Sequence, residues 1–322
     1  MTEVAVTAPL PGTALERLGR TYRVRVRPPG PPLAGAELAA FVGTADACIC
    51  LLADRVTAEV FRACRRLRIV ANYAVGVNNL DLAAAAEAKV VVTNTPDVLT
   101  EATADLAWAL ILAVSRRLLE GDRLVREGRF DGWQPELLLG SGLQGKTLGV
   151  VGLGRIGTAV ARRGVAFGMR VIAHTRKRPS AHPGFECELV EDLEAFLPRV
   201  DVLTLHCPLT SETRGLMDAR RLALLPRGAI LVNTSRGEVV DEGALVAALE
   251  AGRLDGAGLD VFEREPAVHP GLVGRCDVVL LPHLGSATRD TRAAMADLAV
   301  DNVLAVLEGR PPLTPVVPVL AR

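Results

Sequence analysis

The feature that most constrains the fold of this 322-residue sequence is its alternation of short β-rich runs with Ala- and Leu-rich helical stretches. Such alternation is typical of parallel sheets covered by helices, so the sequence predicts an α/β protein. A first series of expected strands covers residues 4–7, 23–27, 47–51, 68–72 and 90–92. These strands predict a small doubly wound parallel sheet.

A second series of strands follows a break at Asn94-Thr95-Pro96-Asp97 and one expected long helix over residues 100–126. Its members are 147–152, 170–174, 202–206, 229–234, 256–261 and 277–281, which predict a second doubly wound sheet. A last helix, over 289–308, is expected to return to the first sheet and bury its apolar face there. The expected domains are therefore 1–96 together with 288–322, and 97–287 between them. A hydrophobic content of 49% is enough for two cores.

The charges of the chain balance, with 37 basic and 37 acidic side chains. A chain without net charge has no overall positive potential that would attract nucleic acid or an anionic membrane, so neither is expected as a partner. The N-terminus does not have the pattern of a secretory signal, and the longest apolar stretch, residues 106–114, is far shorter than the roughly 20 residues of a membrane span. We expect a soluble protein.

The six cysteines form no C-x-x-C pair, and Cys48 and Cys50 point to the same side of one expected strand. This arrangement predicts reduced core cysteines and a cytoplasmic location. The sequence has neither an H-x-x-x-H pattern nor a cluster of Asp, Glu and His at ligand spacing, so no metal site is expected.

A glycine motif, G-x-G-x-x-G, directly follows one apolar strand and precedes a helical run. In this context the first glycine permits a tight turn, the second lets backbone amides approach a pyrophosphate, and the third lets the helix pack close to the strand. The predicted dinucleotide loop consists of Gly152, Leu153, Gly154, Arg155, Ile156 and Gly157. The alternative is a glycine turn without a ligand. The second sheet, which carries this loop, is expected to form a Rossmann cofactor domain. That domain is inserted into a flavodoxin-like substrate domain, which the first sheet and the last helix form.

The strand after this loop ends in His174-Thr175-Arg176-Lys177-Arg178 and lacks the acidic residue that holds the ribose hydroxyls of NAD(H). A carboxylate there would repel a 2′-phosphate, whereas Arg176 and Arg178 can pair with it. The sequence therefore predicts NADP(H) as the preferred cofactor, with NAD(H) second. A solvated basic loop without this role is the alternative.

Three polar residues follow strands of the second series: Arg236, Glu265 and His283. The carboxyl ends of parallel strands share one edge of a sheet, so we expect these side chains together. Arg236 can hold a substrate carboxylate and polarise a keto oxygen, His283 can donate a proton, and Glu265 can orient His283. The set predicts reduction of a 2-keto acid.

His206 and Cys207 are expected on the same edge and offer two alternatives. His206 is a rival proton donor. Cys207 beside it suggests a thiol hydrolase, but adjacent residues on a strand point to opposite faces and cannot easily form an activated pair.

Several segments resemble the D-isomer-specific 2-hydroxyacid dehydrogenases over nearly the whole chain. They are residues 72–81, 93–101, the glycine loop, 231–237, 258–266 and 282–288. The resemblance implies that Arg236, Glu265 and His283 are the catalytic set, and it leaves His206 outside that set. It also implies that the backbone amides of Val75 and Gly76 bind the substrate carboxylate, with Arg236 and His283 as further substrate contacts.

The resemblance and the strand-end loops together predict further cofactor contacts. These are Thr175, Arg176, Arg178, Cys207, Thr234, Ser235, Asp260 and Gly285. Within the family, Trp133-Gln134-Pro135 and the Thr175-Arg176 loop are most similar to glyoxylate/hydroxypyruvate reductases. A phosphoglycerate-type or other D-2-hydroxyacid dehydrogenase is the alternative enzyme. Asn78 stands where many relatives have Asp.

The resemblance also extends to the carboxy-terminal binding proteins, which are nucleotide-sensing corepressors of this architecture. A cofactor-gated interaction module is therefore an alternative from another functional class, because fold alone does not decide function. A homodimer is predicted as well, since the helix over 102–119 carries apolar residues on more than one face and the family forms dimers. These residues are Leu106, Trp108, Leu110, Ile111, Leu112 and Val114.

Overall fold

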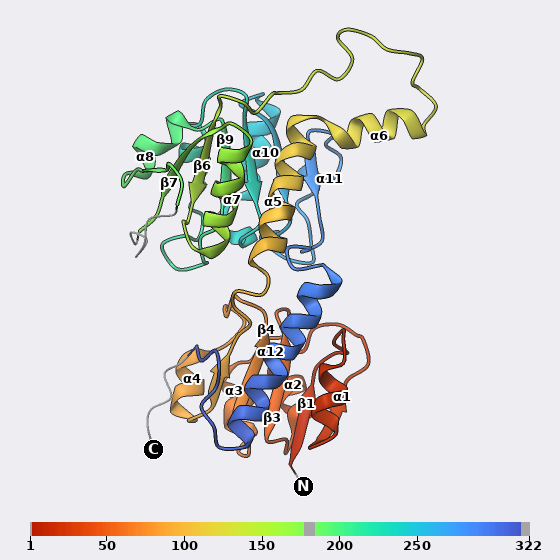
Figure 1. The fold of residues 1–322 in the computed structure, drawn as a ribbon, viewed down its shortest axis with the longest axis vertical. Coiled ribbons are helices and arrows are strands. Elements are labelled where there is room, and N and C mark those ends of the chain that lie inside the picture. The colour runs from red at the N-terminus through yellow and green to blue at the C-terminus, as the bar shows by residue number, and fades with distance from the viewer. Residues whose placement is uncertain (1, 177–183, 317–322) are drawn as a thin grey trace. The chain divides into compact units, whose positions relative to one another are not determined.

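The computed structural model describes residues 2–176 and 184–316, and the chain divides into two compact units (Figure 1). The first unit is Met1–Leu99 with Ser286–Arg322, and the second is Thr100–Gly285. These boundaries differ from the expected 96/97 and 287/288. The first differs because helix α5 begins at Thr100 and packs within the second unit.

The first unit contains a five-stranded parallel sheet with the order β2-β1-β3-β4-β5. This order is that of flavodoxin-like folds and confirms the predicted fold class for this unit. Its strands are β1 Glu3–Val6, β2 Arg23–Val26, β3 Ala47–Leu51, β4 Ile69–Tyr73 and β5 Val91–Thr93. Its helices are α1 Ala14–Gly19, α2 Gly35–Val42, α3 Ala58–Ala63, α4 Leu82–Glu87 and α12 Arg289–Leu307.

The two faces of this sheet have separate cores. Residues of α2, α3 and α4 pack on one face, and residues of α1 and α12 pack on the other. On the second face Ala299, Val300 and Val303 of α12 join Ile49 and Ile69 of the sheet. The expected return of the last helix to the first sheet is therefore confirmed. After α12 the chain runs antiparallel beside β5, where Thr93 pairs with Pro315.

The second unit contains a seven-stranded parallel sheet with the order β12-β11-β10-β9-β6-β7-β8. This is the doubly wound Rossmann order, extended by one strand, and it confirms the predicted fold class for this unit. Its strands are β6 Thr147–Val151, β7 Arg170–His174, β8 Glu188–Leu189, β9 Val202–Leu205, β10 Ala229–Asn233, β11 Leu254–Leu259 and β12 Val278–Leu280. The sequence pattern missed β8, because it is only two residues long.

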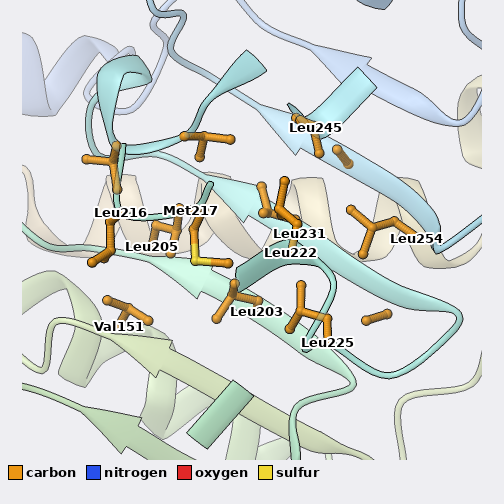
Figure 2. Packing of buried hydrophobic residues seen from close by; sticks show 14 of the residues in the cluster. Val151, Leu203, Leu205, Leu216, Met217, Leu222, Leu225, Leu231, Leu245 and Leu254 are labelled. Atoms are coloured by element: carbon orange, nitrogen blue, oxygen red, sulfur yellow. The ribbon is translucent and has the colours of Figure 1, made fainter. Parts of the chain in front are cut away.

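Helices cover both faces of the seven-stranded sheet. They are α5 Thr100–Ser115, α6 Leu118–Arg126, α7 Arg155–Ala166, α8 Leu193–Phe196, α9 Ala219–Leu222, α10 Glu242–Glu250 and α11 Pro270–Val273, with 3-10 turns η1 Leu197–Arg199 and η2 Gly237–Val239. One core contains residues of α5 and α7, and the other contains residues of α8, α9 and α10. Figure 2 shows the second core, in which Leu203, Leu205 and Leu231 of the strands meet Leu222 and Leu245 of the helices. These cores hold the strands so that their carboxyl ends share one edge.

The single helix expected over residues 100–126 is wrong. Arg117 has a φ of 52° and separates α5 from α6. The carbonyl of Ser115 accepts a hydrogen bond from the N–H of Ser141 over 2.7 Å, so a distant loop takes the place of the next helical donor.

The cysteines are free, but they are not all in the core. Cys48, Cys50, Cys64 and Cys207 are buried, whereas Cys187 is partly exposed and Cys276 is exposed. The expectation of core cysteines is therefore wrong for Cys276, whereas Cys187 packs against the core of α5 and α7 without being fully buried. In the described part of the chain, no helix combines the length and apolarity that a membrane span requires.

Candidate active site

The glycine loop lies between the end of β6 and the start of α7, as its sequence predicts. Gly152 has a φ of 96°, and a Cβ there would lie 2.7 Å from the backbone N of Cys207. At Gly157 a Cβ would lie 2.0 Å from the carbonyl oxygen of Gly152. At Gly154, the N-cap of α7, a Cβ would meet no described atom within 4 Å. The turn and the close packing thus need glycine, and the N-terminus of α7 is open to a pyrophosphate.

Past the end of β7, Arg176 forms an exposed ion pair with Glu212. Arg178, the other predicted phosphate ligand, lies outside the described residues. Burial raises the pKa of the Cys207 thiol, at the end of β9, to about 11. A thiolate nucleophile is therefore not available there at neutral pH, which argues against the thiol hydrolase.

Glu265 and His283 are in direct contact at the carboxyl edge of the second sheet. The Nδ1 atom of His283 lies 3.1 Å from Oε2 of Glu265, and Oε1 of Glu265 accepts a hydrogen bond from the Phe262 N–H over 3.1 Å. Because Nδ1 faces the carboxylate, Nε2 is the ring nitrogen left to serve a substrate.

The charges around Glu265 change its acidity. Burial alone would raise the pKa of Glu265, but the hydrogen bond and positive charge of His283, with the Phe262 N–H and the charge of Arg236, outweigh it and lower the pKa. Glu265 is therefore an anion at neutral pH. The interaction is reciprocal, so the same carboxylate stabilises a positive charge on the imidazole of His283.

Arg236 follows β10 in a turn that other residues hold. Asn233 donates from Nδ2 to the Arg236 carbonyl over 2.8 Å, and its Oδ1 accepts from the N–H and the hydroxyl of Ser235 over 3.0 and 2.8 Å. At Gly237 a Cβ would lie 1.8 Å from the carbonyl carbon of Phe262, so only glycine fits. Burial lowers the pKa of Arg236, and Glu265 and Glu238 oppose the shift. The guanidinium still stays protonated at neutral pH.

Asp260 holds the loop that carries His283. Its side chain is 1% exposed and accepts backbone hydrogen bonds from Leu284 over 2.6 Å and from Gly285 over 2.8 Å. The His283 N–H donates to the Asp260 carbonyl over 2.9 Å. His283 has a φ of 55°, a left-handed conformation that the surrounding bonds stabilise. Burial raises the pKa of Asp260, and the backbone donors and the charge of His283 oppose this.

His206 lies between two threonine hydroxyls. Its Nε2 atom is 2.8 Å from Oγ1 of Thr204, and its Nδ1 atom is 3.5 Å from Oγ1 of Thr234. Burial lowers the pKa of His206 to about 3, so its ring is a neutral imidazole at neutral pH and not the imidazolium acid that proton donation requires. This environment argues against His206 as the acid.

Val75 and Gly76 belong to the first unit, in the loop after β4. Asn94 donates from Nδ2 to the Val75 carbonyl over 2.8 Å, and Asn72 donates from Nδ2 to the Gly76 carbonyl over 2.8 Å. Sequence reasoning did not assign a role to these asparagines, to Asn233 or to Gly237. A signal was present, since each is a polar residue or a glycine near a strand end, in a segment that resembles the family.

Comparison with known proteins decides the family. Residues 108–285 match the family described as D-isomer specific 2-hydroxyacid dehydrogenase, NAD binding domain. A glyoxylate reductase of Thermococcus litoralis is 44% identical over 316 residues, which cover 96% of this chain and 95% of the relative. This chain belongs to the D-isomer specific 2-hydroxyacid dehydrogenase family. It is therefore an NAD(P)-dependent oxidoreductase with a nicotinamide cofactor.

Other known proteins are similar over almost all of the chain. A glyoxylate reductase of Aeropyrum pernix is 46% identical over 318 residues, covering 96% of this chain and 94% of the relative. A solved structure from Thermus thermophilus has a TM-score of 0.93 and 50% identity, covering 98% of this chain and 100% of that one. The NADPH-dependent glyoxylate/hydroxypyruvate reductase of Sinorhizobium meliloti, in complex with NADP and malonate, has a TM-score of 0.88 and 37% identity, covering 100% and 98%.

In this member of the dehydrogenase family, the open N-terminus of α7 and the three glycines fit a dinucleotide. Among the residues that the structure describes, no three His, Cys, Asp or Glu side chains are grouped to hold a metal ion.

Proposed function

We propose that this dehydrogenase reduces glyoxylate and hydroxypyruvate to the corresponding D-2-hydroxy acids with NADPH. The observation that carries the proposal is the Glu265–His283 pair, 3.1 Å apart, on the same sheet edge as Arg236. A proton donor with its carboxylate partner and a cation for the substrate are what reduction of a 2-keto acid requires. The curated relatives named as glyoxylate reductases support the substrate class.

The reaction adds a hydride and a proton across the keto group. NADPH, when bound, supplies the hydride to the carbon atom. His283 donates the proton from Nε2 to the keto oxygen, and Glu265 holds the ring through Nδ1 and stabilises its positive charge. Arg236 polarises the same oxygen and contacts the substrate carboxylate. We assign that carboxylate also to the N–H groups of Val75 and Gly76, as the family resemblance implies.

The preference for NADPH over NADH is part of the proposal. Its support is the strand β7, which ends at His174 without an acidic residue and is followed by Arg176. Arg176 and Arg178 would pair with the 2′-phosphate. The further residues that we propose for the cofactor site would either contact the cofactor themselves or hold the loops that contact it. They are Thr175, Cys207, Thr234, Ser235, Asp260 and Gly285.

We also propose a homodimer, but on a different helix from the one the sequence suggested. Trp108 of α5 is 4% exposed and donates from its indole to the Val160 carbonyl over 3.0 Å, so α5 is buried within its own unit. The exposed apolar side chains lie on α6 and the segment after it, a surface suited to a second copy. They are Leu118, Leu119, Val125, Phe130, Trp133, Leu137 and Leu139.

A cytoplasmic location is proposed from the chemistry of the thiols. Cys48 and Cys50 are free, buried residues of β3, and burial raises the pKa of both, so they stay protonated and inert. Such thiols are typical of reducing compartments.

A panel of four keto acids tests the function: glyoxylate, hydroxypyruvate, pyruvate and phosphohydroxypyruvate, each with NADPH and with NADH. We expect the highest kcat/KM for the first two, with NADPH. A preference for phosphohydroxypyruvate, or for NADH, would refute that part of the proposal, and no turnover of any of them would refute the enzyme. Light scattering at micromolar concentration is expected to give the mass of two chains.

A further inference from the structure

Two carbonyl groups of the loop after β4 are held by the residues that follow β5. The backbone N–H of Thr95 donates to the Ala74 carbonyl over 2.9 Å, and the side-chain amide of Asn94 donates to the Val75 carbonyl over 2.8 Å. Both donors come from one dipeptide at the carboxyl end of β5. The loop therefore has its carbonyl directions set by a neighbouring strand end.

The directions of the carbonyls also determine the directions of two N–H groups. In a trans peptide the C=O and the N–H point to opposite sides, and the 74–75 and 75–76 peptides are both trans. Holding the carbonyls of Ala74 and Val75 thus aims the N–H groups of Val75 and Gly76 the other way. Among the described residues, neither N–H donates to a protein acceptor. Paired backbone donors of this kind can bind an anion.

Glycine at position 76 makes an external restraint necessary. A residue without a Cβ has many accessible φ and ψ values, so the 75–76 peptide can rotate at little cost. The side chain of Asn94 opposes this rotation from one side of the peptide, at Val75. Asn72, which is 0% exposed, opposes it from the other side through its bond to the Gly76 carbonyl.

Asn94 is itself held by the segment after α12. The hydroxyl of Thr314 donates to the Asn94 carbonyl over 2.6 Å, and the Asn94 N–H donates to the Thr314 carbonyl over 3.3 Å. Asn302, a fully buried residue of α12, accepts from the Thr314 N–H over 3.0 Å and donates to its hydroxyl over 2.9 Å. A continuous set of hydrogen bonds therefore connects α12 to the Val75 carbonyl, all within the first unit.

We propose that Asn94 is a positioning residue for the substrate carboxylate. Its side chain orients the N–H of Gly76 toward that carboxylate, and Thr314 and Asn302 keep Asn94 in place. The inference rests on the proposed function, because it concerns the same carboxylate subsite. It predicts that Asn94, whose side chain bonds the Val75 carbonyl and not the substrate, controls the affinity of the enzyme for 2-keto acids.

Asn94→Ala tests the proposal by separating KM from kcat. The KM for glyoxylate is expected to rise about tenfold, because a charge-assisted contact to the carboxylate is weakened. The kcat and the Kd of NADPH are expected to stay within about twofold, since the carboxylate is bound alike in the ground state and the transition state. Calorimetry with oxamate, a carboxylate that is not reduced, should show the same loss of affinity as glyoxylate.

Two more variants distinguish the positioning role from a general loss of stability. Thr314→Val removes the hydroxyl bond to the Asn94 carbonyl and the bond that the same hydroxyl accepts from Asn302, but it keeps the Asn94 side chain, so KM is expected to rise less, by about threefold. Asp46→Ala is the matched control, because Asp46 accepts from the Glu3 N–H over 2.9 Å just before β3, at the amino edge of the same sheet. It is expected to lower thermal stability without a change in KM.

The outcomes distinguish this proposal from the proposed function. An Asn94→Ala KM within twofold of the parent, a fall in kcat at unchanged KM, or an equal KM rise in Asp46→Ala would overturn the positioning role. If the parent binds oxamate, Asn94→Ala weakens that binding, and the parent turns over no keto acid, the positioning role stands and the proposed function fails.

Discussion

Replacing His283 with glutamine tests the proton transfer directly. The structure places Nδ1 of His283 3.1 Å from Glu265, which leaves Nε2 to protonate the keto oxygen. Glutamine at this position can still donate a hydrogen bond but has no acidic proton. The lost contribution is that of a general acid, about 10²- to 10⁴-fold in kcat, or about 3 to 5 kcal/mol of transition-state stabilisation.

The assay is steady-state glyoxylate reduction followed by NADPH consumption, over a range of pH. The Kd of NADPH is expected to be unchanged, because the glycine loop and α7 are untouched. His283→Asn provides a second variant, since asparagine tolerates the observed φ of 55° and so separates loss of the acid from strain in the backbone. Both variants should lose activity to a similar extent.

Glu265→Gln extends the test to the pair. Removing the carboxylate takes away the charged partner that holds the His283 ring through Nδ1, so kcat for glyoxylate reduction should fall. The double variant should be little worse than His283→Gln alone, because the two residues act as one unit.

The reasoning would be refuted by near-normal kcat in His283→Gln. A collapse of activity in His206→Gln, with His283→Gln active, would transfer the acid role to His206. Additive losses in the double variant would show that Glu265 acts on something other than His283.

Three further predictions follow from other parts of the structure. Arg176→Ala together with Arg178→Ala should weaken NADPH binding by about tenfold or more with little change for NADH, measured as Kd for each cofactor; equal losses would contradict the 2′-phosphate assignment. The low pKa of His206, about 3 against about 6.5 when unfolded, means that the unfolded state binds more protons between these values, so stability should fall as pH falls through this range, by up to about 1.4 kcal/mol per pH unit. Urea unfolding at several pH values should show a smaller acid loss in His206→Gln, and an unchanged slope would show that the ring is not buried as a neutral group. Val125→Asp together with Phe130→Asp, on the exposed surface of α6 and the segment after it, should convert the dimer to monomer in light scattering, and a variant that still has the dimer mass would place the interface elsewhere.

The local pattern of the sequence was sufficient for most strands, for both sheets and for the candidate site edge. Alternating runs predict parallel strands, and parallel strands put their carboxyl ends on one edge, so Arg236, Glu265 and His283 could be grouped without coordinates. The glycine loop was equally readable, because strand, motif and helix are consecutive in the chain. Each of these inferences uses residues that are near one another in sequence or related by strand order.

The tertiary structure alone decided the features that depend on distant partners. The long helix breaks at Arg117 because Ser141, from a returning loop, binds the carbonyl of Ser115. The Asp260 carboxylate accepts hydrogen bonds from the two backbone N–H groups that follow His283. Asn94 is hydrogen-bonded to Thr314, 220 residues further along the chain. Burial, which keeps the His206 ring neutral, is likewise set by packing. Hydrogen bonds and burial between remote residues leave no periodic trace in a sequence, so only the folded chain reveals them.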